Sequence, residues 1–314
     1  MKFLVLGASG FIGKNLVRSL ALEQDNTVVA FSRKGQVEFA GRNNISVVNG
    51  DFLKLSSPWK LLEGVDVVYH LIATSKPSST NLDIAAEMTD LVRPTDILLR
   101  ACVDQGVSKV IFISSGGTVY GKDQTPPFNE LMREQPINAY GIQKVQIEKM
   151  LYLYNYLYGL DYNVVRLANP FGPGQDPAGN LGVVTTFIYK AITGEEAIVY
   201  GNGDIVRDYI YIDDVIRSLR KLELYSGEYR LFNLGSGSPR SIIDIIQSIE
   251  HALSTRLSIK YVDGRKSDVP VNYLDVSRFT SCFGYPASTS FEKGISLTAE
   301  YLRNQTVKQG GLYE

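Results

Sequence analysis

Short apolar runs alternate with longer stretches of helical periodicity through the first half of the chain. The apolar runs are rich in β-branched residues, which is typical of strands buried on both faces of a parallel sheet. They occupy 1–6, 27–31, 45–48, 66–70, 110–113 and 163–167, and the clearest helical stretches are 11–22, 83–105 and 138–158. This alternation predicts an α/β fold built on a doubly wound parallel sheet, whose ligands bind beyond the carboxyl ends of the strands.

A glycine turn follows the first apolar run directly, with Gly7, Gly10 and Gly13 in the segment GASGFIG. Glycines allow the backbone to approach phosphate groups, and a helix that begins near Gly10 presents free N–H groups and the positive end of its dipole. The order of strand, glycine turn and helix predicts a pyrophosphate site of the Rossmann type. The three-and-three spacing makes this turn one residue longer than GxGxxG, and by itself such a turn can also be purely structural.

The pattern changes after Leu167, where 169–180 is rich in Gly and Pro. Helical periodicity resumes at 183–192, so 169–180 is a loop rather than a linker. We therefore expect a dinucleotide-binding Rossmann domain at 1–167 and a smaller α/β substrate-binding lobe at 168–314. Part of 208–245 is expected to pack back on the first domain.

Composition narrows the range of partners. The 32 basic and 33 acidic residues give a net charge of -1, so neither nucleic acid nor a membrane surface is an expected partner. Two cysteines and two histidines, far apart in the sequence, argue against a disulfide framework and against a metal site. The chain has no apolar run of membrane-spanning length and no secretory leader, which predicts a small-molecule enzyme of the cytoplasm.

Tyr140 and Lys144 lie four residues apart in the predicted helix 138–158, and therefore on one face of it. A lysine so placed is expected to stabilise tyrosinate and to bring the phenol pKa from about 10 towards neutrality, which suits a catalytic acid/base. Alone, such a pair is usually an ordinary surface pair. The glycine turn and the polar loop 114–121, which follows the strand 110–113, favour the catalytic interpretation.

Six motifs carry a resemblance to a known family. They are GASGFIG at 7–13, Gly50-Asp51, SSGGTVYG at 114–121, YGIQK at 140–144, Asn169-Pro170 and RDYIYIDD at 207–214. On these motifs the chain resembles the extended short-chain dehydrogenase/reductases of the nucleotide-sugar epimerase, dehydratase and reductase group, along nearly all of its length.

The resemblance implies a role for each site residue. Tyr140 would be the acid/base, and Lys144 would hold the nicotinamide ribose. The cofactor would also contact Gly7, Ser9, Gly10, Phe11, Ile12, Gly13, Asp51, Phe52, Leu71, Ala73 and Ser114, with Asp51 at the adenine. A nucleotide-diphosphate sugar would contact Asn169, Tyr200, Arg207, Arg265 and Asp268. The guanidinium groups suit a diphosphate because they donate in a fork, although surface ion pairs are the alternative.

The resemblance further implies a homodimer that pairs through 96–103 and the helix 138–158. Tyr152, Tyr154, Tyr156 and Tyr158 crowd the end of that helix. Alternating positions cannot all share one helical face, so packing against another surface is preferred to stacking on a ligand.

Two departures from the family affect the site. The family's catalytic Ser or Thr aligns with Gly116, so Ser115 or Thr118 must supply the second hydrogen bond to the sugar oxygen. Thr118 is favoured because strand alternation would place it on the face of Gly116 and Ser115 on the opposite face. In 83–105, Leu91 and Pro94 replace a family Asn and Gly, and the proline would kink a helix that did not begin nearby.

A third departure lies at the end of the second strand. Ser32, Arg33 and Lys34 stand where the family's NAD-dependent epimerases have an aspartate for the adenosine ribose. A carboxylate would repel a 2′-phosphate, whereas these three residues would bind one, so NADP is favoured over NAD. A solvated basic turn is the structural alternative.

The cofactor separates the candidate reactions. A 4-epimerase returns its hydride to the sugar, whereas a reductase consumes a reduced cofactor, usually NADPH. The expected function is therefore NADPH-dependent reduction at C4 of a nucleotide 4-keto-6-deoxyhexose, for example dTDP-4-dehydro-6-deoxyglucose, for surface polysaccharides. A UDP-hexose 4-epimerase with bound NAD is the alternative, and a non-catalytic NADP-sensing module is a remote one. The nucleotide base and the product stereochemistry stay open.

Overall fold

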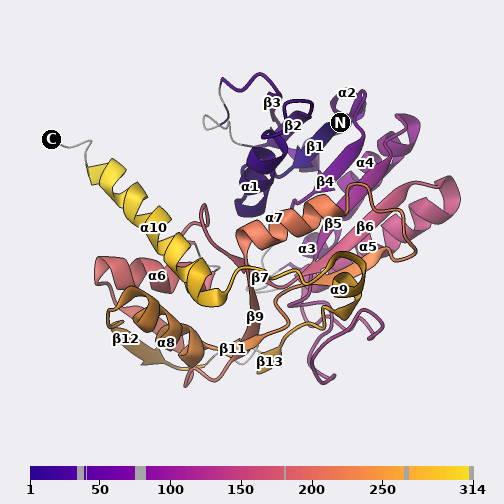
Figure 1. The fold of residues 1–314 in the computed structure, drawn as a ribbon. Coiled ribbons are helices and arrows are strands. Elements are labelled where there is room, and N and C mark those ends of the chain that lie inside the picture. Colours follow the sequence, from indigo (N-terminus) through magenta and orange to yellow (C-terminus); the bar gives the residue numbers. More distant parts are fainter. Residues whose placement is uncertain (34–38, 40, 75–82, 180–181, 265–268, 311–314) are drawn as a thin grey trace. The chain divides into compact units, whose positions relative to one another are not determined.

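The chain forms two compact units in a computed structural model (Figure 1). The structure describes residues 1–33, 39, 41–74, 83–179, 182–264 and 269–310. The first unit comprises 1–124, 130–167 and 216–233, and the second comprises 125–129, 168–215 and 234–314. Two segments, 125–129 and 216–233, thus lie across the boundary that the sequence places after Leu167.

A seven-stranded sheet in the order β10-β6-β5-β4-β1-β2-β3 forms the centre of the first unit. The strands are β1 (Lys2–Leu6), β2 (Thr27–Ser32), β3 (Ile45–Asn49), β4 (Val67–His70), β5 (Lys109–Ser115), β6 (Asp161–Leu167) and β10 (Leu231–Leu234). Every pairing from β3 through β6 is parallel. The chain winds outward from β1 to β3 and then from β4 to β6, which confirms the doubly wound sheet and places its switch point between β1 and β4.

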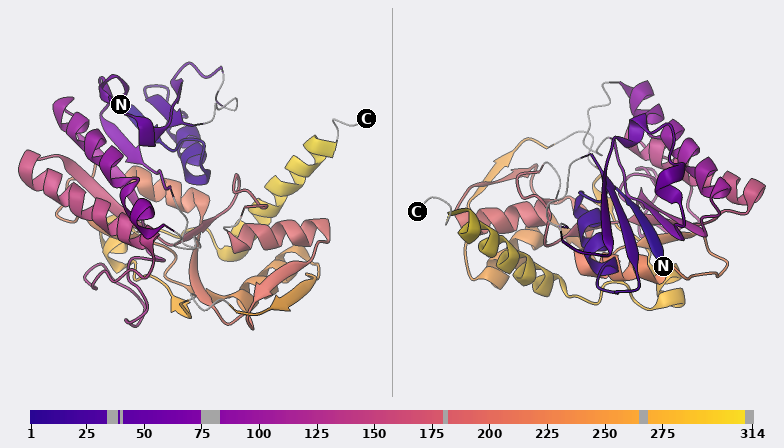
Figure 2. Two further views of the ribbon diagram at one scale, coloured as in Figure 1. Left: turned by 180° about the vertical axis from the view of Figure 1, so that it is seen from behind. Right: turned by 90° about the horizontal axis from the view of Figure 1, so that it is seen from above.

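Helices cover both faces of this sheet (Figure 2). In the first unit, α1 (Phe11–Leu20) and residues 216–221 of α7 (Ile212–Lys221) lie on one face, and α4 (Val92–Asp104) and α5 (Ala139–Tyr158) lie on the other. Among the described residues the first unit also contains the short helices η2 (Phe52–Lys54), α2 (Trp59–Leu62) and α3 (Ile84–Thr89). The core between the sheet and α4 and α5 includes Val68, Phe112, Leu98 and Leu151, all buried.

The expectation of one continuous helix over 83–105 is wrong. The structure ends α3 at Thr89 and begins α4 at Val92. Pro94 is the reason, because it has no N–H and its ring would clash with the carbonyl group of Asp90 in a continuous helix. A helix that begins at Val92 places the proline in its first turn, where an N–H would find no intrahelical partner.

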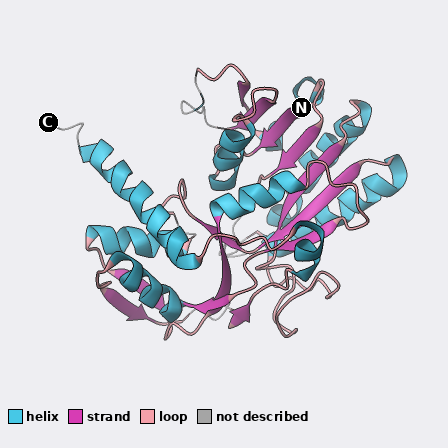
Figure 3. Cartoon of the chain, viewed as in Figure 1, coloured by secondary structure: helices cyan, strands magenta, loops and turns pink. Residues whose placement is uncertain are grey.

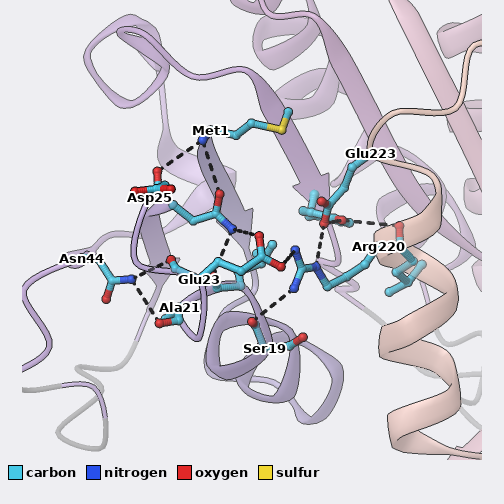
Figure 4. Close-up of polar contacts among 12 residues, drawn as sticks. Met1, Ser19, Ala21, Glu23, Asp25, Asn44, Arg220 and Glu223 are labelled. Atoms are coloured by element: carbon cyan, nitrogen blue, oxygen red, sulfur yellow. Dashed lines mark hydrogen bonds and ion pairs between the residues drawn. The ribbon is translucent and has the colours of Figure 1, made fainter.

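Polar contacts join the segment 216–233 to the rest of the first unit (Figure 4). Arg220 donates to Glu23 at 2.6 Å and to the Ser19 carbonyl oxygen at 3.3 Å, and it also pairs with Glu223 at 3.2 Å. The Tyr69 hydroxyl, on β4, donates to the same Glu223 carboxylate at 2.6 Å. Contacts with β4 and with the end of α1 therefore hold the second half of α7, and the buried Glu223 carboxylate is paired rather than isolated.

The second unit contains two small sheets and the helices that pack on them (Figure 3). In one sheet β9 (Val206–Tyr211) pairs in parallel with β7 (Asn169–Phe171) and β13 (Val271–Asn272), and antiparallel with β11 (Pro239–Ser241). The other joins β8 (Ala197–Tyr200) to β12 (Ile259–Val262). The remaining helices are α6 (Val183–Thr193), α8 (Ile242–Leu253), α9 (Ser277–Phe283) and α10 (Phe291–Gly310), besides residues 212–215 of α7.

Candidate active site

The glycine turn after β1 leaves space beside the backbone that larger side chains would occupy. Gly7 has φ +87, and the backbone N–H groups of Gly7 and Ala8 donate to the Phe31 carbonyl oxygen of β2. Gly10 caps α1 without any side-chain hydrogen bond, and a Cβ on Gly13 would lie 2.2 Å from the Gly7 carbonyl oxygen. The first N–H groups of α1 thus face a turn with little bulk, with Ser9 exposed and Phe11 and Ile12 half-buried beside it.

The turn lies at the switch point of the sheet. A Cβ on Gly7 would lie 3.4 Å from Ile72 and from the Leu71 carbonyl carbon, both just beyond β4. Leu71 is half-buried there, and Ala73 is exposed. These residues fit a dinucleotide, because the backbone donors, the helix terminus and the missing side chains meet where doubly wound folds bind pyrophosphate.

The ends of β2 and β3 present the other predicted cofactor residues. Ser32 is buried at the end of β2, and Arg33 is exposed beside it. Asp51 begins η2 and accepts from the Leu53 backbone N–H at 3.2 Å, while Phe52 is buried against His70. Lys34 lies outside the described residues.

The loop after β5 favours Ser115 over Thr118 as the hydroxyl group that meets Tyr140. Ser115, the last residue of β5, is hydrogen-bonded to Tyr140, whereas the buried Thr118 hydroxyl has no hydrogen-bond partner among the described residues. The preference for Thr118 assumed that strand alternation continues through 118. It does not, because β5 ends at Ser115 and a turn follows.

Lys144 is buried beneath Tyr140 on α5. Its Nζ donates to the Ile113 carbonyl oxygen at 2.9 Å and to the Ile72 carbonyl oxygen at 3.5 Å, and lies 5.5 Å from the centre of the Tyr140 ring. The Asn138 side chain caps this helix by accepting from the Gly141 N–H at 2.7 Å. The lysine thus links α5 to strand β5 and to the loop after β4, close to the phenol.

The pKa values of this pair differ from the expectation. Burial raises the pKa of Tyr140 to about 12, and its hydrogen bond with Ser115 opposes that rise. Burial also lowers the pKa of Lys144 to about 7, against the opposing effect of the Glu148 carboxylate. The prediction that Lys144 brings the phenol pKa towards neutrality is therefore wrong for this structure, because burial disfavours the charged form of both groups.

The sequence did not lead us to predict the buried ion pair between Glu148 and Arg166, which lies near Lys144. Glu148 accepts from the Ser114 hydroxyl at 2.5 Å and from Arg166 Nη2 at 2.6 Å. Because the Ser114 side chain is engaged in this way, its contact with a cofactor would have to come from the backbone. Two signals were available, a carboxylate one turn after Lys144 and an arginine within an apolar strand.

The second unit brings two of the predicted substrate residues onto neighbouring strands. Asn169 on β7 pairs in register with Tyr209 of β9, two positions from Arg207, and its side-chain amide donates to the Asp208 carbonyl oxygen at 2.9 Å. Arg207 is half-buried and donates to the Val206 carbonyl oxygen at 2.8 Å. Tyr200 ends β8 and is 40% exposed. Arg265 and Asp268 lie outside the described residues.

Two aspartates of the RDYIYIDD motif are structural in this unit. Asp208 is buried and accepts from the backbone N–H and the hydroxyl of Ser236 at 2.8 and 2.5 Å. Asp214 accepts from the Ser288 hydroxyl at 2.9 Å. These contacts fix the loops around β9, the strand that carries Arg207.

No group of His, Cys, Asp and Glu side chains that could hold a metal ion occurs in the part of the chain that the structure describes. Within the same residues, no helix is both long enough and apolar enough to cross a membrane.

The fold and this site define a class of protein. A Rossmann-type glycine turn at the switch point, followed by a Tyr-Lys pair beside the loop after β5, is the arrangement of an extended short-chain dehydrogenase/reductase. The model of the NAD dependent epimerase/dehydratase family matches residues 3–235.

Individual proteins match over nearly the whole chain. A UDP-glucose 4-epimerase of Mycolicibacterium smegmatis is 30% identical, over 98% of this chain and 100% of that protein. A dTDP-4-dehydro-6-deoxyglucose reductase of Escherichia coli is 28% identical, over 96% of this chain and 97% of that protein. The crystal structure of a UDP-glucose 4-epimerase of Thermotoga maritima with UDP-glucose is 31% identical and has a TM-score of 0.89, over 98% of this chain and 100% of that one.

The chain belongs to the NAD dependent epimerase/dehydratase family and is an enzyme of the extended short-chain dehydrogenase type.

Proposed function

We propose that the protein is a nucleotide-sugar 4-epimerase that acts on a UDP-hexose with NAD. The observation that carries this proposal is the hydrogen-bonded Ser115-Tyr140 pair above buried Lys144, placed beside the glycine turn at the switch point. Likeness to UDP-glucose 4-epimerases over nearly the whole chain supports it. This function replaces the reductase as the leading candidate.

Tyr140 is the residue that moves the proton. In the tyrosinate form that a bound oxidised nicotinamide would favour, its oxygen would take the proton of the C4 hydroxyl as the C4 hydride is transferred to that cofactor, and would return the proton when the hydride comes back to the opposite face. Burial keeps the phenol protonated at neutral pH, so the resting residue is an acid that can hydrogen-bond the sugar oxygen. Ser115 orients this phenol.

Lys144 joins α5 to strand β5 and the loop after β4, and it would hold the cofactor ribose. A bound nicotinamide would supply the hydride acceptor and, when oxidised, a positive charge that favours tyrosinate. Lys144 would donate to the ribose hydroxyls while keeping its bond to Ile113.

The sugar nucleotide is assigned to residues of the second unit. Arg207 and Asn169 would hold its diphosphate, because a guanidinium donates in the forked geometry that phosphate oxygens accept. Arg265 is proposed as a further diphosphate ligand and Asp268 as a ligand of the nucleoside sugar, with Tyr200 beside them.

One observation favours the NADPH-dependent C4-ketoreductase as a second candidate. The residues at the end of β2 are Ser32 and Arg33, with no carboxylate for an adenosine ribose, and Arg33 is exposed where a 2′-phosphate would lie. Likeness to a dTDP-4-dehydro-6-deoxyglucose reductase supports this alternative.

One experiment separates the candidates. The purified protein is denatured and its released cofactor identified, and a second sample is incubated with UDP-glucose alone or with NADPH and dTDP-4-dehydro-6-deoxyglucose, followed by NMR of the sugars. Bound NAD with formation of UDP-galactose supports the epimerase. Reduction of the keto sugar with loss of NADPH transfers the assignment to the reductase, and cofactor binding without turnover of either sugar favours the sensing module.

A further inference from the structure

A second set of buried charges lies beside the predicted catalytic residues. Arg166, on β6, is fully buried, and it pairs with Glu148 of α5 through two contacts, Nη2 to Oε2 at 2.6 Å and Nε to Oε1 at 3.2 Å. Glu134 accepts from the same Nη2 at 2.6 Å. Burying such charges destabilises the fold unless they are paired in good geometry. Arg166 and the two carboxylates are therefore called the Arg166 cluster.

Glu148 connects the Arg166 cluster to the end of β5. Its Oε1 accepts from the Ser114 hydroxyl at 2.5 Å, between Ile113, whose carbonyl oxygen accepts from Lys144, and Ser115, which is hydrogen-bonded to Tyr140. One carboxylate therefore holds the strand end from which both catalytic side chains are oriented.

Glu148 also lies one helical turn beyond Lys144, so the two side chains share a face of α5. The other titratable groups near the lysine are Tyr140 on α5 and His70 on β4. Burial lowers the pKa of His70 to about 3, so its imidazole is neutral at physiological pH. Glu148 is therefore the carboxylate, among the described residues around Lys144, that favours its charged form.

We propose that Glu148 is a positioning residue: paired with Arg166 and hydrogen-bonded to Ser114, it fixes the end of β5 and places a carboxylate on the same face of α5 as Lys144. The proposal rests on the proposed role of Tyr140 and Lys144 in catalysis. Glu134 provides a matched control, since it accepts from the same guanidinium but is partly exposed and has no part in the bond to Ser114.

The test is a direct titration of Lys144. The protein is labelled with ¹³C at lysine Cε, and the Lys144 signal is assigned by its loss in Lys144→Met. In Glu148→Gln we expect the pKa of Lys144 to fall by about one unit, as for a buried group that loses a neighbouring opposite charge. In Glu134→Gln it should stay at the wild-type value. An unchanged titration in Glu148→Gln, or equal shifts in both variants, would overturn the proposal.

A second variant guards against misfolding, because Glu148→Gln leaves part of the Arg166 charge unpaired. Glu148→Gln combined with Arg166→Met removes both charges of this pair, and a smaller fall in the Lys144 pKa is expected, because the loss of the nearby guanidinium charge opposes part of the effect.

The pH dependence of kcat then tests the link to catalysis. The basic limb should move to lower pH in the Glu148 variants and not in Glu134→Gln. Uniformly reduced kcat with an unmoved limb means a merely structural role and overturns the proposal. If the wild-type protein turns over no nucleotide sugar, the proposed function fails, while the lysine titration still decides the role of Glu148.

Discussion

Lys144 Nζ donates to the carbonyl oxygen of Ile113 at 2.9 Å, and this bond joins the helix that carries the candidate acid/base to the strand that carries Ser115. The lysine is buried, so its position is set by packing as well as by charge. Tyr140 lies one turn earlier on the same helix. Each prediction below on catalysis follows from this placement of a phenol, a hydroxyl and an ammonium group at one strand end.

Replacing Tyr140 with Phe should remove the proton transfer and leave binding intact. Turnover should fall by roughly 10²–10⁴, the usual contribution of a positioned acid/base. Cofactor affinity should stay within about twofold of wild type, because the ring is retained. Steady-state kinetics and a fluorescence titration measure the two effects, and unchanged turnover would exclude Tyr140 from the mechanism.

Ser115→Ala should slow the reaction more than Thr118→Val. Ser115 is hydrogen-bonded to Tyr140, and its loss leaves the phenol less well oriented. A decrease on the order of 10²–10³ is expected, as when one preorganised donor is removed. The kcat values of the two variants are compared, and the opposite ranking would assign the second hydrogen bond to the Thr118 hydroxyl.

The stability of the protein should rise with pH because of Lys144. Burial lowers its pKa to about 7 in the folded chain, whereas an unfolded lysine titrates near 10.4. Between these values the unfolded state binds the extra proton, so the folded state gains stability as pH rises from about 7 towards 10 and bears the full cost below 7.

Urea unfolding at pH 7 and pH 9, at equal cofactor occupancy, measures this effect. Relative to Lys144→Met, the wild-type protein should gain more than about 1 kcal/mol in free energy of unfolding between these pH values. Parallel behaviour of the two proteins would contradict a lowered lysine pKa.

Cofactor preference should depend on the end of β2. Ser32→Asp with Arg33→Asn adds an acceptor for a ribose hydroxyl and a charge that repels a 2′-phosphate, so the ratio of NADH to NADPH affinity should rise by about tenfold or more. Calorimetric titration of both cofactors into the wild-type and altered proteins measures the ratio. An unchanged ratio would show that this turn does not contact the adenosine ribose.

The chain should form a homodimer through α5. Tyr152, Leu153 and Tyr156 are 62%, 49% and 76% exposed on this helix, an apolar surface of the kind that pairs between subunits. Tyr154 faces inward and donates to Asp96 at 2.6 Å. Light scattering should give twice 34.8 kDa for the wild-type protein.

Tyr156→Lys should shift this equilibrium towards the monomer by placing a charge in the apolar contact. Leu224→Lys is the matched control, since Leu224 is 81% exposed outside α5 and its substitution should leave the mass unchanged. A wild-type protein that stays monomeric at micromolar concentration would contradict the dimer.

The parallel sheet, the glycine turn and the Tyr140-Lys144 pair could all be predicted from the sequence by itself. Each depends on residues close together in the chain: runs of β-branched residues form buried strands, glycines allow a positive φ at Gly7, and a spacing of four places two side chains on one helical face. The break before Pro94 was also foreshadowed, since a proline disfavours a continuous helix.

Tertiary structure alone decided which hydroxyl meets Tyr140 and how burial moves the pKa values of Tyr140 and Lys144. Alternation could not place Thr118 because β5 ends at Ser115, and a strand end depends on its neighbours rather than on its own residues. The pairing of Glu148 with Arg166 joins a helix to a strand that begins only after that helix ends, and the cost of burying these charges appears only once both are packed.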